Sequence, residues 1–187
     1  MSEIIPGESD LTDYQQTIED SSESISLWQA SLFEGESIAS YLYRLRLQNA
    51  VSAPSSLSQA LELGVVLNRW EKFRFNPFPT ETELQILSQF CGESIDKLAE
   101  AFPPESERKK FMARTIRLCA ACCVQACYHR LKWQFDSVSG CADHKLRLLS
   151  KCPGCEKKFA IASSLWTHKS CECGMRLTKM IKHQQRY

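Results

Sequence analysis

Eight cysteine and histidine residues in the C-terminal half of this chain fall into two successive sets of four. The first set is Cys119, Cys122, Cys141 and His144, and the second is Cys152, Cys155, Cys171 and Cys173. A short spacing between paired ligands lets the backbone turn so that both face one ion, and two such pairs complete a tetrahedral zinc shell. Four protein ligands leave no position for a catalytic water, so we expect two structural zinc ions.

Three further residues lie near the first set in the sequence and compete with it for the metal: Cys123, Cys127 and His129. Cys141 and His144 already supply a properly spaced second pair, so the extra residues are not needed as ligands. We therefore interpret the two cysteines as small buried thiols and His129 as a packed or hydrogen-bonded ring.

The second set departs from the common spacing, because a single residue separates Cys171 from Cys173. This shorter spacing strains the turn that brings both sulfur atoms to one ion. His168 is the reserve ligand if either cysteine fails to reach the metal. The sequence alone therefore does not decide which of Cys171, Cys173 and His168 complete the second site.

Charge is distributed unevenly along the 187 residues, although the net charge is only +1. Residues 1 to 40 carry nine acidic and no basic side chains, whereas residues 105 to 187 carry seventeen Lys or Arg against six Asp or Glu. A cationic surface of this kind attracts a phosphate backbone. The candidate contacts to nucleic acid or a partner are Arg69, Lys72, Arg108, Lys109, Lys110, Arg114, Arg130, Lys132, Lys145 and Arg147.

Ten cysteines can indicate a secreted disulfide scaffold, but the start of this chain argues against that interpretation. It opens Met-Ser-Glu-Ile-Ile-Pro-Gly-Glu, with neither the basic region nor the apolar region of a signal peptide. No apolar run approaches the length of a membrane span. We expect an intracellular zinc protein without membrane contact.

Apolar residues recur at helical spacing in the N-terminal half. Ile38, Tyr41, Leu42 and Leu45 follow the i, i+3, i+4, i+7 pattern behind Ser37, a candidate N-cap. This spacing predicts a first helix that ends near Asn49.

Four more helices are predicted before residue 104. Two short ones are joined at Gly64. The second, from Val65 to Phe73, places Trp70 in the expected core, and its polar residues complete a helix-turn-helix pattern. Thr80 and Glu83 form a capping box that begins a fourth helix, and Ser94 begins a fifth. The predicted fold class is therefore an N-terminal helix-turn-helix domain followed by a small zinc-stabilised α+β part, built as two tandem zinc-ribbon or finger modules.

Composition divides the chain into four parts. Residues 1–26 read as a disordered acidic tail, residues 30–104 as the helical domain, residues 105–115 as a charged linker and residues 116–187 as the tandem zinc domain. Within the zinc domain Leu131, Trp133 and Phe135 alternate with polar residues, which predicts a strand beneath the first metal site.

Several of these residues recur together in one known pattern. The C-terminal half reads Arg117-Leu118-Cys119-x-x-Cys122, His129-Arg130, Trp133, Cys141-x-x-His144, Leu148 and Cys152-Pro153-x-Cys155. This arrangement resembles the zinc-binding signature of the TniQ family of transposon target-selection proteins. The helical half, with Gly35-Glu36-Ser37 and Trp70-Glu71-x-Phe73-x-Phe75-Asn76-Pro77, is similar to the short TniQ proteins of CRISPR-associated transposons. The resemblance spans about Leu32 to Leu177.

The resemblance implies an adaptor that is not an enzyme and has a helix-turn-helix domain before its zinc module. It implies as partners a CRISPR effector with guide RNA, an AAA+ ATPase regulator of the TnsC type and, indirectly, the transposase. It also implies contact with the target DNA backbone and a location in the bacterial cytoplasm. The spacing of Cys171 and Cys173 departs from the family pattern.

Two other functions compete with the adaptor. A transcriptional regulator would read DNA bases with the third helix, but Asn68, Arg69 and Lys72 are few base-reading side chains and no heptad repeat supplies a dimer. A zinc hydrolase or deaminase needs an open metal position and a His-x-Glu arrangement, and the sequence offers neither.

Overall fold

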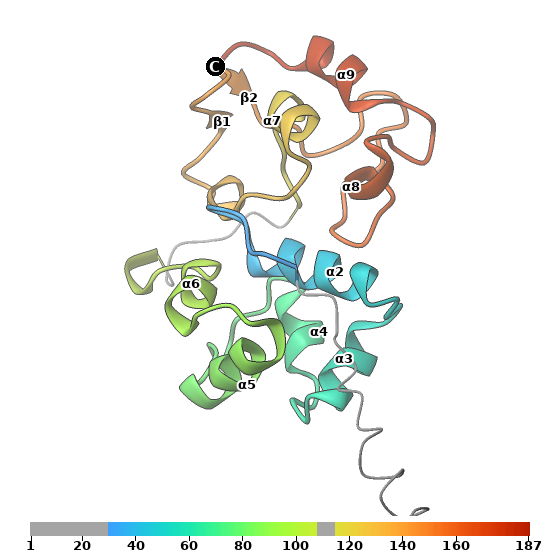
Figure 1. Cartoon of the computed structure of the whole chain (residues 1–187). Coiled ribbons are helices and arrows are strands. Elements are labelled where there is room, and N and C mark those ends of the chain that lie inside the picture. The colour runs from blue at the N-terminus through green and yellow to red at the C-terminus, as the bar shows by residue number, and fades with distance from the viewer. Residues whose placement is uncertain (1–29, 108–114) are drawn as a thin grey trace, which may run out of the picture.

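The computed structural model describes residues 30–107 and 115–187, which form two halves stacked one on the other (Figure 1). The lower half contains the helices that follow Ala30, and the upper half contains both sets of metal-ligating residues. The predicted acidic tail lies outside the described residues, as does most of the predicted linker, of which Glu105–Glu107 form a 3-10 helix. Within the described residues, no helix has both the length and the apolar character needed to cross a membrane.

The helices of the lower half begin near the residues that the local sequence predicts. They are α2 (Ile38–Gln48), α3 (Pro54–Ala60), α4 (Val66–Trp70), α5 (Glu81–Cys91) and α6 (Ile95–Glu100). Ser37 caps α2 by accepting a hydrogen bond from the amide of Ser40, and Asn49 is its C-cap. Thr80 and Glu83 form the predicted capping box, and Gly92 ends α5 with a φ of 74°.

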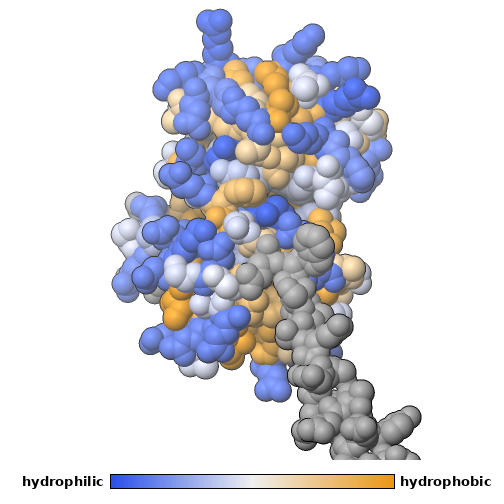
Figure 2. All heavy atoms as spheres, in the orientation of Figure 1, coloured by the Kyte–Doolittle hydropathy of each residue, from blue (hydrophilic) through white to orange (hydrophobic). Residues whose placement is uncertain are grey.

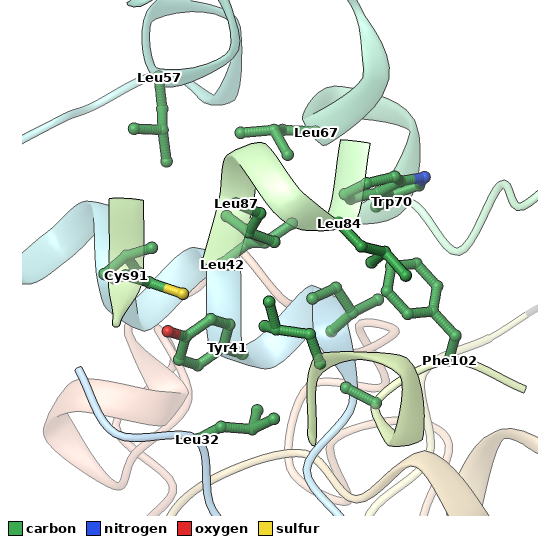
Figure 3. Packing of buried hydrophobic residues seen from close by; sticks show 14 of the residues in the cluster. Leu32, Tyr41, Leu42, Leu57, Leu67, Trp70, Leu84, Leu87, Cys91 and Phe102 are labelled. Carbon is green, nitrogen blue, oxygen red and sulfur yellow. The ribbon is translucent and has the colours of Figure 1, made fainter. Parts of the chain in front are cut away.

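These helices enclose an apolar core (Figure 3). Trp70 is fully buried and meets Phe102 edge to face, with 5.0 Å between ring centroids. The prediction that Trp70 is a core residue is therefore confirmed. Leu42 from α2 and Leu87 from α5 are also fully buried, and each such side chain stabilises the fold by about 1.5–3 kcal/mol.

Helix α4 is shorter than the sequence predicts. The pattern suggested a helix from Val65 to Phe73, but α4 ends at Trp70, and Phe73 adopts a φ of 55° that turns the chain out of the helix. Helices α3 and α4 pack against each other around the turn that contains Gly64, whose φ is 58°. A DNA-reading role for this pair stays a prediction.

The upper half is built from short elements. They are α7 (Ala120–Gln125), η2 (Leu131–Gln134), β1 (Gly140–Cys141), β2 (Leu146–Arg147), α8 (Leu165–His168), α9 (Leu177–Met180) and η3 (Ile181–His183). Strands β1 and β2 are antiparallel, with Gly140 opposite Arg147. The C-terminal residues extend this sheet, because the Arg147 amide donates to the Gln185 carbonyl and the Tyr187 amide donates to the Lys145 carbonyl, both at 2.8 Å.

The predicted strand over Leu131, Trp133 and Phe135 is wrong. Leu131–Gln134 forms the 3-10 helix η2, in which the Trp133 amide donates to the Arg130 carbonyl. Leu131 and Trp133 are buried, so the apolar residues do face inward as the alternation suggested. The backbone nevertheless turns after Arg130, and the Leu131 amide is bonded to the carbonyl of Gly35 in the lower half, where a strand partner would otherwise be needed.

Candidate metal centres

The first predicted ligand set comes together in one cluster. Cys119 lies at the start of α7, Cys122 lies within it, and Cys141 and His144 lie in and after strand β1. Nδ1 of His144 is 3.2 Å from the Cys122 sulfur, 3.6 Å from that of Cys141 and 3.8 Å from that of Cys119. The Cys122 and Cys141 sulfur atoms are 3.5 Å apart. Zn–S bonds of ~2.3 Å place tetrahedral sulfur atoms ~3.8 Å apart, so this donor set fits a zinc ion.

The second set forms a separate cluster nearer the surface. The Cys152 and Cys173 sulfur atoms are 3.7 Å apart, and those of Cys155 and Cys171 are also 3.7 Å apart. These distances match the edges of a tetrahedral zinc–thiolate shell. Cys152 is buried, whereas Cys173 is exposed, so one side of this cluster faces water.

A tight turn accommodates the short spacing of Cys171 and Cys173. Gly174 adopts a φ of 84°, its amide donates to the Cys171 carbonyl at 2.8 Å, and the Cys171 amide donates to the Met175 carbonyl at 2.9 Å. The left-handed conformation of Gly174 therefore lets both sulfur atoms reach one ion without two intervening residues. His168, the reserve ligand, lies at the end of α8 and is not part of the cluster.

The residues that competed for the first site are not part of its cluster. Cys123 is fully buried on α7, and the half-buried Cys127 faces the Leu165 carbonyl at 3.7 Å. A hydrogen bond with Cys127, together with burial, raises the pKa of Cys123, which keeps it a neutral thiol. His129 is a buried, hydrogen-bonded ring, as its sequence context predicted.

One thiol in each cluster ionises more readily than a free cysteine. A hydrogen bond from the Cys122 side chain lowers the pKa of Cys119 to about 5. A backbone hydrogen bond from Met175 lowers the pKa of Cys173 to about 7. Zinc binds the thiolate form, so Cys119 and Cys173 are the thiols most ready to bind it, whereas the hydrogen bond to Cys119 raises the pKa of Cys122.

Gln184 supports the first cluster through its side chain, a role that no sequence pattern indicated. Its Oε1 accepts a hydrogen bond from the Ala120 amide at 2.9 Å, beside Cys119, and its Nε2 donates to the Arg147 carbonyl at 2.6 Å. The side chain is buried, so it joins α7 to strand β2 in a site protected from water. This contact fixes the two ligand-bearing elements relative to each other.

The two halves of the molecule meet where residues 35–37 pair with residues 129–131. The Ser37 amide donates to the His129 carbonyl at 2.9 Å, and the Leu131 amide donates to the Gly35 carbonyl at 2.9 Å. The Ser37 hydroxyl lies 2.9 Å from Nδ1 of His129. We refer to this pairing as the junction. Helix α2 lies between the two cores, since Ala39 packs into the upper one and Leu42 into the lower one.

His129 is held as a neutral ring within the junction. Burial lowers its pKa to about 3, because the charged form would lose its hydration. The Ser37 oxygen accepts the Ser40 amide, so its own proton is available for an unprotonated Nδ1. Trp133 and Phe73 pack edge-on against the ring, with centroids 5.8 Å and 5.3 Å from it.

An aromatic stack covers one edge of the junction. Phe33 from the lower half stacks on Tyr128 from the upper half, with 4.9 Å between ring centroids. The Arg44 guanidinium lies 4.2 Å from the Phe33 ring centre, and the Tyr128 hydroxyl donates to the Glu34 carbonyl. Side chains as well as backbone therefore join the two halves.

Three of the predicted cationic contacts are engaged within the protein. Arg69 donates to the Pro77 carbonyl at 2.7 Å. The half-buried Arg130 guanidinium lies 4.9 Å and 5.0 Å from the ring centres of Tyr128 and Trp133. Lys132 forms an exposed ion pair with Asp143 at 3.8 Å, which contributes little to stability. Arg69 and Arg130 therefore make contacts within the fold, whereas the Lys132 side chain stays exposed.

Other predicted contacts face the solvent. Lys72, Lys145 and Arg147 are exposed, and Lys145 and Arg147 flank Leu146 on the edge of the upper half. Figure 2 shows hydrophilic side chains around the rim of this half, with hydrophobic ones between them. The remaining candidates, which lie outside the described residues, are Arg108, Lys109, Lys110 and Arg114.

Comparison with known families matches the chain to one of them. The TniQ family model matches residues 27–148, which is more than half of the chain. The chain belongs to the TniQ family. Membership makes it a transposition-associated protein, and the match spans the helical half, the junction and the first metal cluster of this TniQ protein. A search of the curated proteins finds no match to the chain.

Proposed function

We propose that this TniQ protein is a target-selection adaptor without catalytic chemistry of its own. It links a CRISPR effector with its guide RNA to an AAA+ ATPase regulator of the TnsC type, and so recruits the transposase. The observation that carries the proposal is the TniQ match over residues 27–148. It agrees with the resemblance of the helical half to the short TniQ proteins of CRISPR-associated transposons.

The metal clusters support a structural role for zinc. Each cluster offers four protein donors within 4.8 Å of one another. A zinc ion held by all four has no position left for a catalytic water. When bound, the ions hold the ends of short elements together, since the upper half contains little regular secondary structure of its own.

The junction supports an adaptor, because an adaptor must hold two binding surfaces at a fixed separation. The backbone pairing of residues 35–37 with residues 129–131 and the buried Ser37–His129 contact join the halves directly. The lower half then presents a protein-docking surface. Lys145 and Arg147 in the upper half face a nucleic-acid backbone, which positions the protein without reading a base sequence.

The DNA-binding regulator is a weaker candidate. Helix α4, the expected recognition helix, has only five residues, and its Asn68 and Arg69 are half-buried. Arg69 is also bonded to the Pro77 carbonyl. A helix that reads the major groove needs several exposed side chains that reach base edges.

The proposal is tested by measuring binding of the purified protein to each partner separately. The protein is immobilised and exposed to the ATPase regulator, to the CRISPR effector with guide RNA, and to random and genomic duplex DNA. We expect it to retain the regulator and the RNA-loaded effector, and to bind duplex DNA without sequence preference. Sequence-specific duplex binding at physiological salt, with no retention of either protein partner, would instead support the regulator.

A further inference from the structure

A groove of about 550 Å³ lies between the two halves, on the side of α4. Phe73 and Lys72 contribute to one wall, and residues 158–162 of the upper half contribute to the other. Phe159 and Ile161 are 8% and 5% exposed, so the upper wall rests on the apolar core of that half. This volume is in the range of sites that hold ligands or peptide side chains.

The mouth of the groove is positively charged. Lys72 and Lys158 are exposed, and neither has an ion-pair partner among the described residues. The carboxylate in the wall, Glu71, accepts hydrogen bonds from Arg46 at 2.6 Å and 2.8 Å, and both side chains are nearly buried. Glu71 is therefore neutralised in place, and the groove suits a segment that combines large apolar side chains with carboxylates.

We propose that residues 10–14 of the same chain bind in this groove. Their sequence is Asp-Leu-Thr-Asp-Tyr. Leu11 and Tyr14 supply the apolar side chains for the groove, and Asp10 and Asp13 supply carboxylates for Lys72 and Lys158. The site is independent of the transposition partners proposed above.

The composition of the N-terminal segment matches the groove. Residues 1–29 contain seven acidic and no basic side chains. Within that segment, residues 10–14 place two carboxylates and two large apolar side chains within five positions. A segment with the opposite charge would be repelled by the two lysines.

The covalent connection makes even a weak contact effective. The chain is anchored at its first described residues, because Ala30 is buried and the Leu32 amide donates to the Glu93 carboxylate at 2.6 Å. The sixteen residues from Tyr14 to Ala30 span up to about 50 Å when extended, which permits access to the groove. A tether of this kind gives the segment an effective concentration on the order of 1 mM near its own groove. A segment that binds as a free peptide with a Kd of ~100 µM would then occupy the groove of its own chain in about 90% of the molecules.

The test uses a fluorescent peptide of residues 1–20 and measures its anisotropy with the full-length protein. The groove is emptied by Leu11→Ser with Tyr14→Ser. We expect this double variant to bind the peptide with a Kd on the order of 100 µM, and the parent protein to bind it about tenfold more weakly because its own segment competes. Equal binding of the peptide by the parent and the double variant would contradict occupation of the groove by residues 10–14 of the same chain. The groove would then be available to a partner protein.

Charge reversal locates the binding site. Lys72→Glu with Lys158→Glu, added to the emptied protein, should weaken peptide binding at least tenfold, and a peptide with Asp10→Lys and Asp13→Lys should restore it. Lys182→Glu is the matched control, because this exposed lysine is not part of the groove, and it should change the Kd less than twofold. A similar loss with Lys182→Glu would show attraction to basic surface in general and contradict the proposal. Zinc content and circular dichroism verify that each variant is folded.

Discussion

Ser37 and His129 join the two halves of the protein through two hydrogen bonds, although 92 residues separate them in the sequence. The Ser37 amide donates to the His129 carbonyl, and the Ser37 hydroxyl lies 2.9 Å from Nδ1 of the ring. Ser37 is also the N-cap of α2. One buried serine thus fixes the start of the helix that lies between the two cores and the position of the upper half against it.

The neutral state of His129 predicts a loss of stability in mild acid. Its pKa is about 3 in the folded protein and ~6.5 in an unfolded chain, so below pH 6.5 the unfolded state takes up a proton that the native ring does not. This ring should reduce the free energy of unfolding by about 1.4 kcal/mol between pH 7.5 and pH 5.5. Urea denaturation at both pH values measures the effect.

His129→Asn should remove this part of the pH dependence, even though it also destabilises the protein at neutral pH. The cysteines of the metal clusters are the same in both proteins. The difference between the two slopes of unfolding free energy against pH therefore reports the contribution of the His129 ring alone. His183→Asn is the control, because His183 is exposed. Equal slopes for His129→Asn and the parent would show that the buried ring does not resist protonation.

Ser37→Ala should cost more than the loss of an ordinary helix cap. Ser94 caps α6 through the Lys97 amide at an exposed position, and its replacement by Ala should cost about 1 kcal/mol. Ser37→Ala also removes the partner of a buried histidine, so we expect about 2–3 kcal/mol. Equal costs for the two substitutions in chemical denaturation would mean that the Ser37–His129 contact contributes nothing.

Metal analysis of the purified protein should return two zinc ions per chain. Cys119→Ser and Cys152→Ser should each lower the content to about one, because each removes a ligand from one cluster. Cys123→Ala and His168→Ala are matched controls, since both residues lie next to a cluster in sequence without belonging to it. A loss of zinc in either control would reassign the ligands, and one ion or none in the parent would contradict both sites.

Lys145 and Arg147 should account for part of the salt dependence of nucleic-acid binding. Each phosphate contact contributes about 0.9 to the slope of log affinity against log salt on duplex DNA, so replacing both by Ala should lower the slope by about 1.8. Lys157→Ala is the control, because the Lys157 side chain is already bonded to Glu172 at 3.1 Å. An unchanged slope in the double variant would remove these two residues from the interface.

Ligand spacing made the metal clusters predictable, because residues close in sequence carry most of their own geometry. Cys119 with Cys122 and Cys152 with Cys155 needed only a local turn to face one ion. The pair Cys171 and Cys173 stayed open in the sequence, because its geometry depends on the left-handed conformation of Gly174. Helix caps such as Ser37 were predictable for the same local reason.

Contacts between distant residues could not be predicted in this way. The alternation of Leu131 and Trp133 indicated a strand, but the backbone pairs there with Gly35 in the other half and turns into a 3-10 helix. Nothing near Gln184 in the sequence indicates that its side chain bonds the amide of Ala120. Both outcomes depend on tertiary packing, which local patterns do not encode.

The adaptor role is tested most directly by capture of three components together. The RNA-loaded CRISPR effector is immobilised, the ATPase regulator is supplied in solution, and retention of the regulator is measured with and without this TniQ protein. We predict that the regulator is retained only when the TniQ protein is present, and that Cys119→Ser reduces this retention while Cys123→Ala does not. Retention of the regulator to the same extent without the TniQ protein, or no retention with it, would contradict the proposed role.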